Sequence, residues 1–152
     1  MGRGFWAVII LISVLILLII YAQVQGVTRS IPVNLTGTSW TLTYYENDGG
    51  TLVPAVNGTE VNVSFGLDNV TSLGGYSGCN RYRYTYTVSN FTLALTNGDT
   101  TRMTCDAPGV MQLESAYMHD LENTSGIRFR SDHLFLYDTA DRALLIFERK
   151  TS

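Results

Sequence analysis

The sequence predicts a mostly β member of the α+β class. We expect an antiparallel twisted sheet or incomplete barrel of about seven strands with one covering α-helix, preceded by an N-terminal transmembrane helix. An apolar run opens the chain, several later segments alternate apolar and polar residues, and one segment has helical apolar spacing. The 152 residues divide into an anchor over 1–26, a tether over 27–34 and one domain over 35–150.

The apolar run extends from Phe5 to Ala22 and is interrupted only by Ser13. A helix of this length covers roughly 27 Å, close to the hydrocarbon thickness of a bilayer, whereas a signal-peptide core is usually shorter. Arg3 favours a cytoplasmic N-terminus. We therefore expect a single-pass protein anchored in the cell membrane, with its C-terminal domain extracellular or pseudo-periplasmic. Cleavage after Ala22 or Gly26 would instead give a secreted domain.

The first half of the domain contains two predicted strands. Trp40–Tyr45 alternates and leads into a turn at Glu46–Gly50, and Glu60–Phe65 places its apolar residues on one face. Leu67–Gly75 is interpreted as a turn-rich link, and the run Gly74–Gly78 as a bend before the next strand.

A hairpin is predicted in the middle of the domain. Arg81–Val88 is the clearest strand, because tyrosines recur at every second residue. Ser89 and Asn90 make a tight connection to a second strand at Phe91–Leu95.

One helix follows, with Asp106 as its expected cap and Pro108 in its first turn. Asn123 to Gly126 are expected to end it, with Gly126 able to take a positive φ. Its apolar stripe consists of Val110, Leu113, Tyr117 and Leu121. Three strands close the chain, with a turn at Asp138–Arg142 between the last two. They are Ile127–Arg130, Leu134–Tyr137 and Ala143–Arg149.

The charge balance beyond Gly26 argues against a nucleic-acid partner. Residues 27–152 carry 9 Lys plus Arg and 13 Asp plus Glu, a net charge of −4, and Lys150 is the sole lysine. No basic patch dense enough for nucleic acid is present.

Six of the nine asparagines begin an Asn-x-Ser/Thr triplet, whereas the Ser and Thr content predicts about two. We expect N-glycosylation of these sites on an outer surface, although a Thr-rich β sequence can also generate such triplets by chance. The six are Asn34, Asn57, Asn62, Asn69, Asn90 and Asn123.

The two cysteines, Cys79 and Cys105, lie in the part of the chain expected outside the membrane, where thiols tend to oxidise. A disulfide between them is the favoured interpretation. The alternatives are two reduced, buried cysteines, or a catalytic thiol with His119 or His133 as its base.

No metal site, cofactor or catalytic site is expected. The chain lacks the ligand spacing of a zinc site, a nucleophile elbow, a phosphate-binding glycine loop and a calcium loop. The carboxylate pairs Asp138 with Asp141 and Asp120 with Glu122 are attributed to turn chemistry and solubility.

The tyrosine stripe has two interpretations. Core positions are favoured for Tyr82 and Tyr86. Tyr84 could instead join Arg81 and Arg83 in an exposed face that stacks on sugars or on a partner's aromatic groups.

Several spaced motifs resemble the META domain, the family of the heat-shock protein HslJ. The resemblance covers about Leu35 to Lys150. The motif G-x-x-G-C-N-x-[YF]-x-x-x-Y is matched by Gly75, Gly78, Cys79, Asn80, Tyr82 and Tyr86; T-[RK]-M-x-C by Thr101, Arg102, Met103 and Cys105; and E-x-x-[FY]-x-x-x-L by Glu114, Tyr117 and Leu121. Tyr84 departs from the family, which commonly has glycine there, and no cysteine for lipid attachment follows Ala22.

The resemblance implies a small β-rich domain with a role in the cell envelope and a link to stress or drug tolerance, but no agreed catalytic site. It also implies that Cys79 and Cys105 form a staple. Together with Asn80, Arg102, Met103 and Glu114 they would form one structural cluster where hairpin and helix meet.

The leading hypothesis is therefore a membrane-anchored, non-catalytic domain that acts in envelope stress or by binding an envelope protein. A module that binds a surface carbohydrate or envelope polymer is the alternative. A thiol-dependent or hydrolytic enzyme is the third hypothesis.

Overall fold

The structure, a computed structural model, describes residues 12–14, 16, 34–67 and 71–150. The chain forms two compact units, Met1–Val33 and Asn34–Ser152. Most of the predicted transmembrane segment, and the predicted tether apart from Asn34, lie outside the described residues. Within the described ranges, no helix is both long and apolar enough to cross a membrane.

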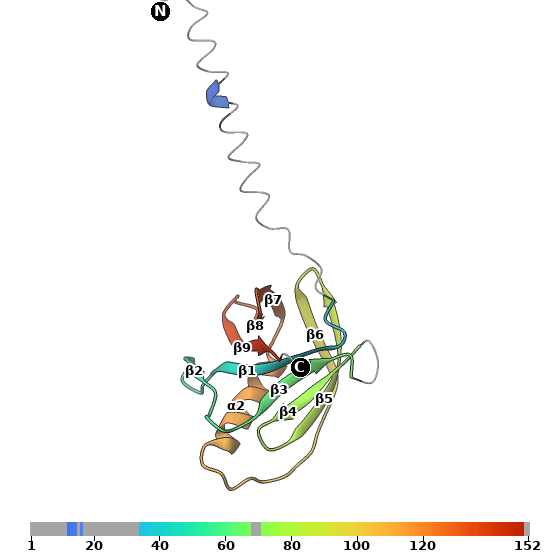
Figure 1. Ribbon diagram of the computed structural model, residues 1–152, viewed down its shortest axis with the longest axis vertical. Coiled ribbons are helices and arrows are strands. Elements are labelled where there is room, and N and C mark those ends of the chain that lie inside the picture. Colours follow the sequence, from blue (N-terminus) through green and yellow to red (C-terminus); the bar gives the residue numbers. More distant parts are fainter. Residues whose placement is uncertain (1–11, 15, 17–33, 68–70, 151–152) are drawn as a thin grey trace, which may run out of the picture. The chain divides into compact units, whose positions relative to one another are not determined.

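Nine strands and one helix make up the described part of the second unit (Figure 1). The elements are β1 (Thr38–Glu46), β2 (Leu52–Pro54), β3 (Val61–Phe65), β4 (Ser72–Ser77), β5 (Arg81–Ser89), β6 (Thr92–Thr100), α2 (Val110–Glu122), β7 (Gly126–Arg130), β8 (His133–Tyr137) and β9 (Ala143–Arg149). All strand pairs are antiparallel, in the order β2-β1-β3-β4-β5-β6-β7-β8-β9, and β1 also pairs with β9. The mostly β architecture with one helix is confirmed, and the sheet has nine strands rather than the expected number of about seven.

The pairing of β1 with β9 closes the sheet into a barrel that has one narrow seam. Between β6 and β7 only Thr92 and Gly126 are direct partners. Backbone hydrogen bonds from Leu93 to Ser125 (2.9 Å) and from Ile127 to Phe91 (2.8 Å) complete the seam. The expected incomplete barrel is therefore close to the observed fold.

Strand alternation fills the barrel interior. Trp40 of β1 and Val61, Val63 and Phe65 of β3 are each at most 1% exposed. Full burial of such a side chain contributes roughly 1.5–3 kcal/mol, so this inward face is a main source of stability.

The helix packs against β1, β4 and β9 with the predicted apolar stripe. Leu113, Tyr117 and Leu121 are 0% exposed. The predicted cap is wrong: Gly109, with φ of 80°, is the N-cap, and no side chain caps the helix. Cys105 is held by a disulfide, so the chain reaches the helix axis only after the turn at Ala107–Gly109.

The predicted helix end over Asn123 to Gly126 is confirmed, but the positive φ expected at Gly126 is wrong. Asn123 is the C-cap, and its backbone N–H donates to His119 O at 3.1 Å. Gly126 has no positive φ and instead opens β7 opposite Tyr137. An added Cβ at Gly126 would lie 3.3 Å from Tyr137 Cβ, so close strand approach explains this glycine better than a helix cap.

The segment interpreted as a turn-rich link contains most of β4. An added Cβ at Gly74 would lie 2.6 Å from Tyr82 O, and one at Gly75 would lie 2.1 Å from Asn62 O. Both glycines therefore allow neighbouring strands to approach closely. Because glycine has no side chain, β4 lacks the apolar alternation that would predict a strand.

Two further boundaries differ from prediction. β2 is only three residues long and ends at Pro54, which suits an edge position but leaves no periodic pattern. β6 continues to Thr100 rather than ending at Leu95, past an irregularity at Asn97, which has φ of 54°.

Candidate functional site

The motif-bearing residues converge at the turn between β4 and β5. Gly78 has φ of 109°, a conformation that strongly favours glycine, and it turns the chain between Ser77 and Cys79. Ser77 N–H donates to Asn80 O at 2.8 Å, and Ser77, Cys79 and Asn80 are all buried. The bend predicted at the glycine run is therefore limited to Gly78.

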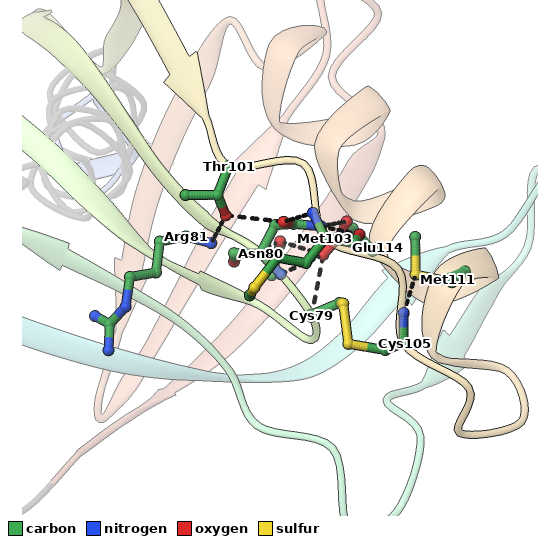
Figure 2. The surroundings of a disulfide bond; sticks show 9 residues. Cys79, Asn80, Arg81, Thr101, Met103, Cys105, Met111 and Glu114 are labelled. Atoms are coloured by element: carbon green, nitrogen blue, oxygen red, sulfur yellow. Dashed lines mark hydrogen bonds between the residues drawn. A yellow bond between two sulfur atoms is a disulfide. The ribbon is translucent and has the colours of Figure 1, made fainter.

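Glu114 of α2 points into this turn, as Figure 2 shows. Its Oε2 accepts hydrogen bonds from Ser77 Oγ (2.6 Å), Cys79 N (3.1 Å) and Asn80 N (2.8 Å). Its Oε1 accepts from Asn80 Nδ2 at 2.6 Å. The helix is thus attached to the β4–β5 turn through one carboxylate.

Asn80 links the same turn to the segment between β6 and α2. Its Oδ1 accepts hydrogen bonds from Met103 N (2.6 Å) and Thr101 Oγ1 (2.8 Å), and its Nδ2 donates to Met103 O (3.0 Å). Thr101 also pairs with Arg81 through Arg81 N to Thr101 Oγ1 at 3.0 Å. The Asn80 side chain therefore donates hydrogen bonds through Nδ2 to both Glu114 and Met103, and accepts hydrogen bonds at Oδ1 from both Met103 and Thr101.

A disulfide joins Cys79 to Cys105, with Cα atoms 5.9 Å apart, so the predicted pairing is confirmed. It closes the same loop that Asn80 holds, and Cys105 N–H donates to Met111 Sδ at 3.5 Å (Figure 2). We call this set the Glu114 cluster; its members are Ser77, Cys79, Asn80, Thr101, Met103, Cys105 and Glu114.

The Glu114 cluster stabilises a buried negative charge. Burial opposes ionisation of Glu114, but hydrogen bonds from Ser77, from the side chain and backbone of Asn80, and from the Cys79 backbone outweigh it. The pKa of Glu114 therefore lies below its usual value of 4.5. Its acceptor capacity is directed at the protein's own backbone, so the carboxylate acts as a cross-link.

The structure separates one predicted member from the cluster and adds two, Ser77 and Thr101. Arg102 is exposed and makes no hydrogen bond or ion pair with any residue in the described ranges. Met103 contributes only its backbone, and its side chain is 53% exposed. Ser77 was missed by sequence reasoning; its place three residues before Asn80, in a tight turn, was the available signal.

The tyrosine stripe lies inside the barrel. Tyr82 and Tyr86 are 4% and 7% exposed, and the Tyr82 and Tyr117 hydroxyls are 2.5 Å apart. Tyr84 is 8% exposed and its hydroxyl donates to Glu122 Oε1 at 2.8 Å. Burial, followed by this hydrogen bond, raises the pKa of Tyr84.

The alternative of an exposed face formed by Arg81, Arg83 and Tyr84 is therefore wrong for Tyr84. Alternation places the two exposed arginines on the outside of β5 and Tyr84 on the inside. Gly98 accounts for the space that Tyr84 occupies, because an added Cβ there would overlap Tyr84 Cε1.

The candidate glycosylation sites differ in exposure. Asn62 is half-buried, and both ends of its side chain are bonded: Nδ2 to Glu60 (2.9 Å) and Oδ1 to Tyr76 N (3.2 Å). Asn69 lies outside the described residues. The exposed sites are Asn34, Asn57, Asn90 and Asn123.

A second polar site lies in a cleft of about 340 Å³ beside α2. Asp120 is only 2% exposed there, and its Oδ2 accepts a hydrogen bond from Glu46 N at 3.0 Å. Burial raises the pKa of Asp120 from 3.8 to about 6. The attribution of Asp120 to solubility is therefore wrong, whereas Asp138 does stabilise its turn, accepting from Ala140 N and Arg142 N at 2.9 Å each.

No triad or larger group of His, Cys, Asp and Glu in the described part of the chain is arranged to hold a metal ion.

Comparison with known proteins agrees with the fold and the motif positions. The family model of the META domain matches residues 33–151. An NMR structure of a protein from Burkholderia xenovorans is 28% identical, with a TM-score of 0.63, and the match covers 78% of this chain and 85% of that one. A crystal structure of a DUF4847 family protein from Bacteroides vulgatus has a TM-score of 0.53 at 14% identity, covering 78% of this chain and 96% of that one, and shows likeness of fold alone.

No curated protein matches the chain. The family match extends over more than three quarters of the sequence and includes every residue of the Glu114 cluster. The chain belongs to the META domain family.

Proposed function

We propose that the chain is a membrane-tethered META domain that acts outside the cell membrane as a non-catalytic module of the envelope. Its exterior would contact a partner, and the Glu114 cluster would keep the module rigid. The resemblance to the HslJ family supports a role in envelope stress.

One observation carries the proposal: two polar residues of the family motifs, Asn80 and Glu114, are turned inward and bonded to each other. Asn80 and Glu114 are 3% and 8% exposed and make seven hydrogen bonds through their side chains. Groups used in this way hold backbone segments in place and are poorly available to a substrate.

The competing hypotheses have less support. Cys79 is fully buried and bonded to Cys105, which leaves no thiolate to act as a nucleophile. A glycan platform on β5 lacks its aromatic residue, because Tyr84 belongs to the core.

Location and oxidation state test the proposal together. Whole cells expressing the full chain should lose the domain to added protease. Extracted protein alkylated before and after reduction should gain mass at two cysteines only after reduction. A protected domain with two freely alkylated thiols would place it in a reducing compartment and refute the proposal.

A further inference from the structure

The β5–β6 hairpin is unusually free of charge. No charged residue occurs between Arg83 and Asp99, although 15% of the whole chain is charged. The inward-facing residues of the hairpin belong to the core, where charged side chains would not be expected. The end of the hairpin extends beyond the core, so packing does not explain the absence of charged residues there.

The turn at the end of this hairpin is unusual as well. Asn90 and Phe91 have φ of 47° and 68°, a pair that suits a two-residue hairpin turn in which glycine is strongly preferred at the second position. A bulky side chain at positive φ is strained. Phe91 is also 43% exposed and neighbouring Val88 is 42% exposed, so neither backbone geometry nor burial accounts for these residues.

The hairpin tip lies at the end of the barrel where the described domain begins. Gly37 N–H donates to Phe65 O at 2.8 Å, which places the start of the domain beside the end of β3. Tyr86 N–H donates to Thr71 O at 2.8 Å, which places β5 beside the loop that follows β3. Figure 1 shows the start of β1 and the β5–β6 connection at the same end.

The chain outside the described domain limits how far this end can lie from the proposed anchor. Eleven residues separate Ala22 from Asn34 in the sequence. Fully extended they span at most roughly 40 Å, and a flexible chain of that length averages about 18 Å end to end. Leu35 is buried in the core, so the tether cannot lengthen by releasing β1.

We propose that the tip of the β5–β6 hairpin, Val88–Thr92, contacts the lipid headgroup region of the membrane that anchors the chain. This rests on the membrane tethering proposed above. An exposed aromatic ring and a valine on an uncharged turn gain from leaving water at this depth. The contact is shallow, because the turn's backbone groups still need water or headgroups as hydrogen-bond partners.

Nuclear magnetic resonance of the full chain in lipid nanodiscs tests the contact. A small fraction of the lipids carries a paramagnetic headgroup, which broadens nearby amide signals. Val88–Thr92 should broaden several-fold more than Asn47–Gly50, which lie at the opposite end of β1. The Phe91→Gly variant should lose most of this broadening and yet unfold at a higher urea concentration, because glycine relieves the positive φ.

A matched control is Leu52→Ser, which removes another exposed apolar side chain, 38% exposed, far from the tip. It should leave the broadening unchanged. If the full chain joins the discs but the tip is not broadened, the lipid contact is refuted while the anchor stands. If the chain elutes apart from the discs, the anchor and with it the function proposed above are refuted.

Two further outcomes would overturn the contact. Tip signals that broaden with protein concentration in the absence of lipid would identify a docking surface for a second copy of the chain. The second outcome is a glycan on Asn90, detected by glycopeptide mapping of protein from its native membrane. Such a glycan would place a hydrophilic group between Val88 and Phe91 and would rule out the lipid contact.

Discussion

Replacing Glu114 with glutamine tests whether the carboxylate is the cross-link that the geometry indicates. The carboxylate accepts four hydrogen bonds, three at Oε2 and one at Oε1. In the better orientation the glutamine oxygen keeps the three, and its NH₂ group faces the Asn80 NH₂ group across 2.6 Å. Flipping Asn80 only moves the conflict, since its Oδ1 already accepts from Met103 N.

The magnitude follows from the bonds lost. A hydrogen bond to a charged group contributes about 1.5–3 kcal/mol, and the remaining bonds weaken when the acceptor becomes neutral. Relief of the burial cost of the charge offsets part of this loss. We expect Glu114→Gln to lower the free energy of unfolding by about 2–4 kcal/mol at pH 7.

The assay is equilibrium urea unfolding of the Asn34–Ser152 unit under non-reducing conditions, followed by Trp40 fluorescence. Because the folded-state pKa of Glu114 lies below 4.5, its contribution is present above pH 4.5 and is lost as pH falls through the folded pKa. The cost of Glu114→Gln should therefore shrink in acid. Glu148→Gln makes the same charge change at an exposed site and should cost less than about 0.5 kcal/mol. A cost below about 1 kcal/mol at pH 7, or one that does not depend on pH, would refute the cross-link.

Three further predictions concern other parts of the domain. Burial raises the pKa of Asp120 from 3.8 to about 6, so the contribution of Asp120 to wild-type stability should fall as pH rises from 3.8 to 6. Asp120→Asn should remove that slope and stabilise the protein by about 1–3 kcal/mol at pH 7.5, as measured by urea titrations across pH; an unchanged slope would show another group responsible. Gly98→Ala should cost about 1–3 kcal/mol because of its overlap with Tyr84, and the cost should shrink in a Tyr84→Ala background; additive costs in this double-mutant cycle would contradict the contact. Replacing both Cys79 and Cys105 with alanine opens a loop of 26 residue steps and should cost about 3–4 kcal/mol in thermal or urea unfolding, while a negligible loss would mean that Asn80 alone holds the loop.

Much of the candidate site could be predicted because its members lie in short, spaced motifs. Cys79, Asn80 and Glu114 were assigned to one cluster from motif resemblance, and the structure brings them together. The hydrogen bond from Ser77 to Glu114 and the separation of Arg102 could not be predicted, because hydrogen-bond partners depend on how the turn, the loop and the helix are oriented; the sequence showed only that Ser77 lies near Asn80 in a tight turn.

The seven predicted strands and the helix were found because their side chains follow the period of the backbone. Val61, Val63 and Phe65 alternate in β3, and Leu113, Tyr117 and Leu121 follow one face of α2. Such patterns are local, because they arise whenever one face of a strand or helix is buried and the opposite face is exposed to solvent.

Other features of the fold depend on contacts between residues far apart in the sequence, and local periodicity does not predict them. Gly74 and Gly75 belong to β4 because neighbouring strands leave no room for a side chain, and a residue without a side chain carries no pattern. Alternation turns Tyr84 inward, but its ring fits there only because Gly98, fourteen residues away, has no side chain. The seven periodic strands, the helix and the cysteine pair could therefore be inferred from the sequence, whereas barrel closure, strand contacts and buried hydrogen bonds depend on residues far apart in the chain, which no local period reports.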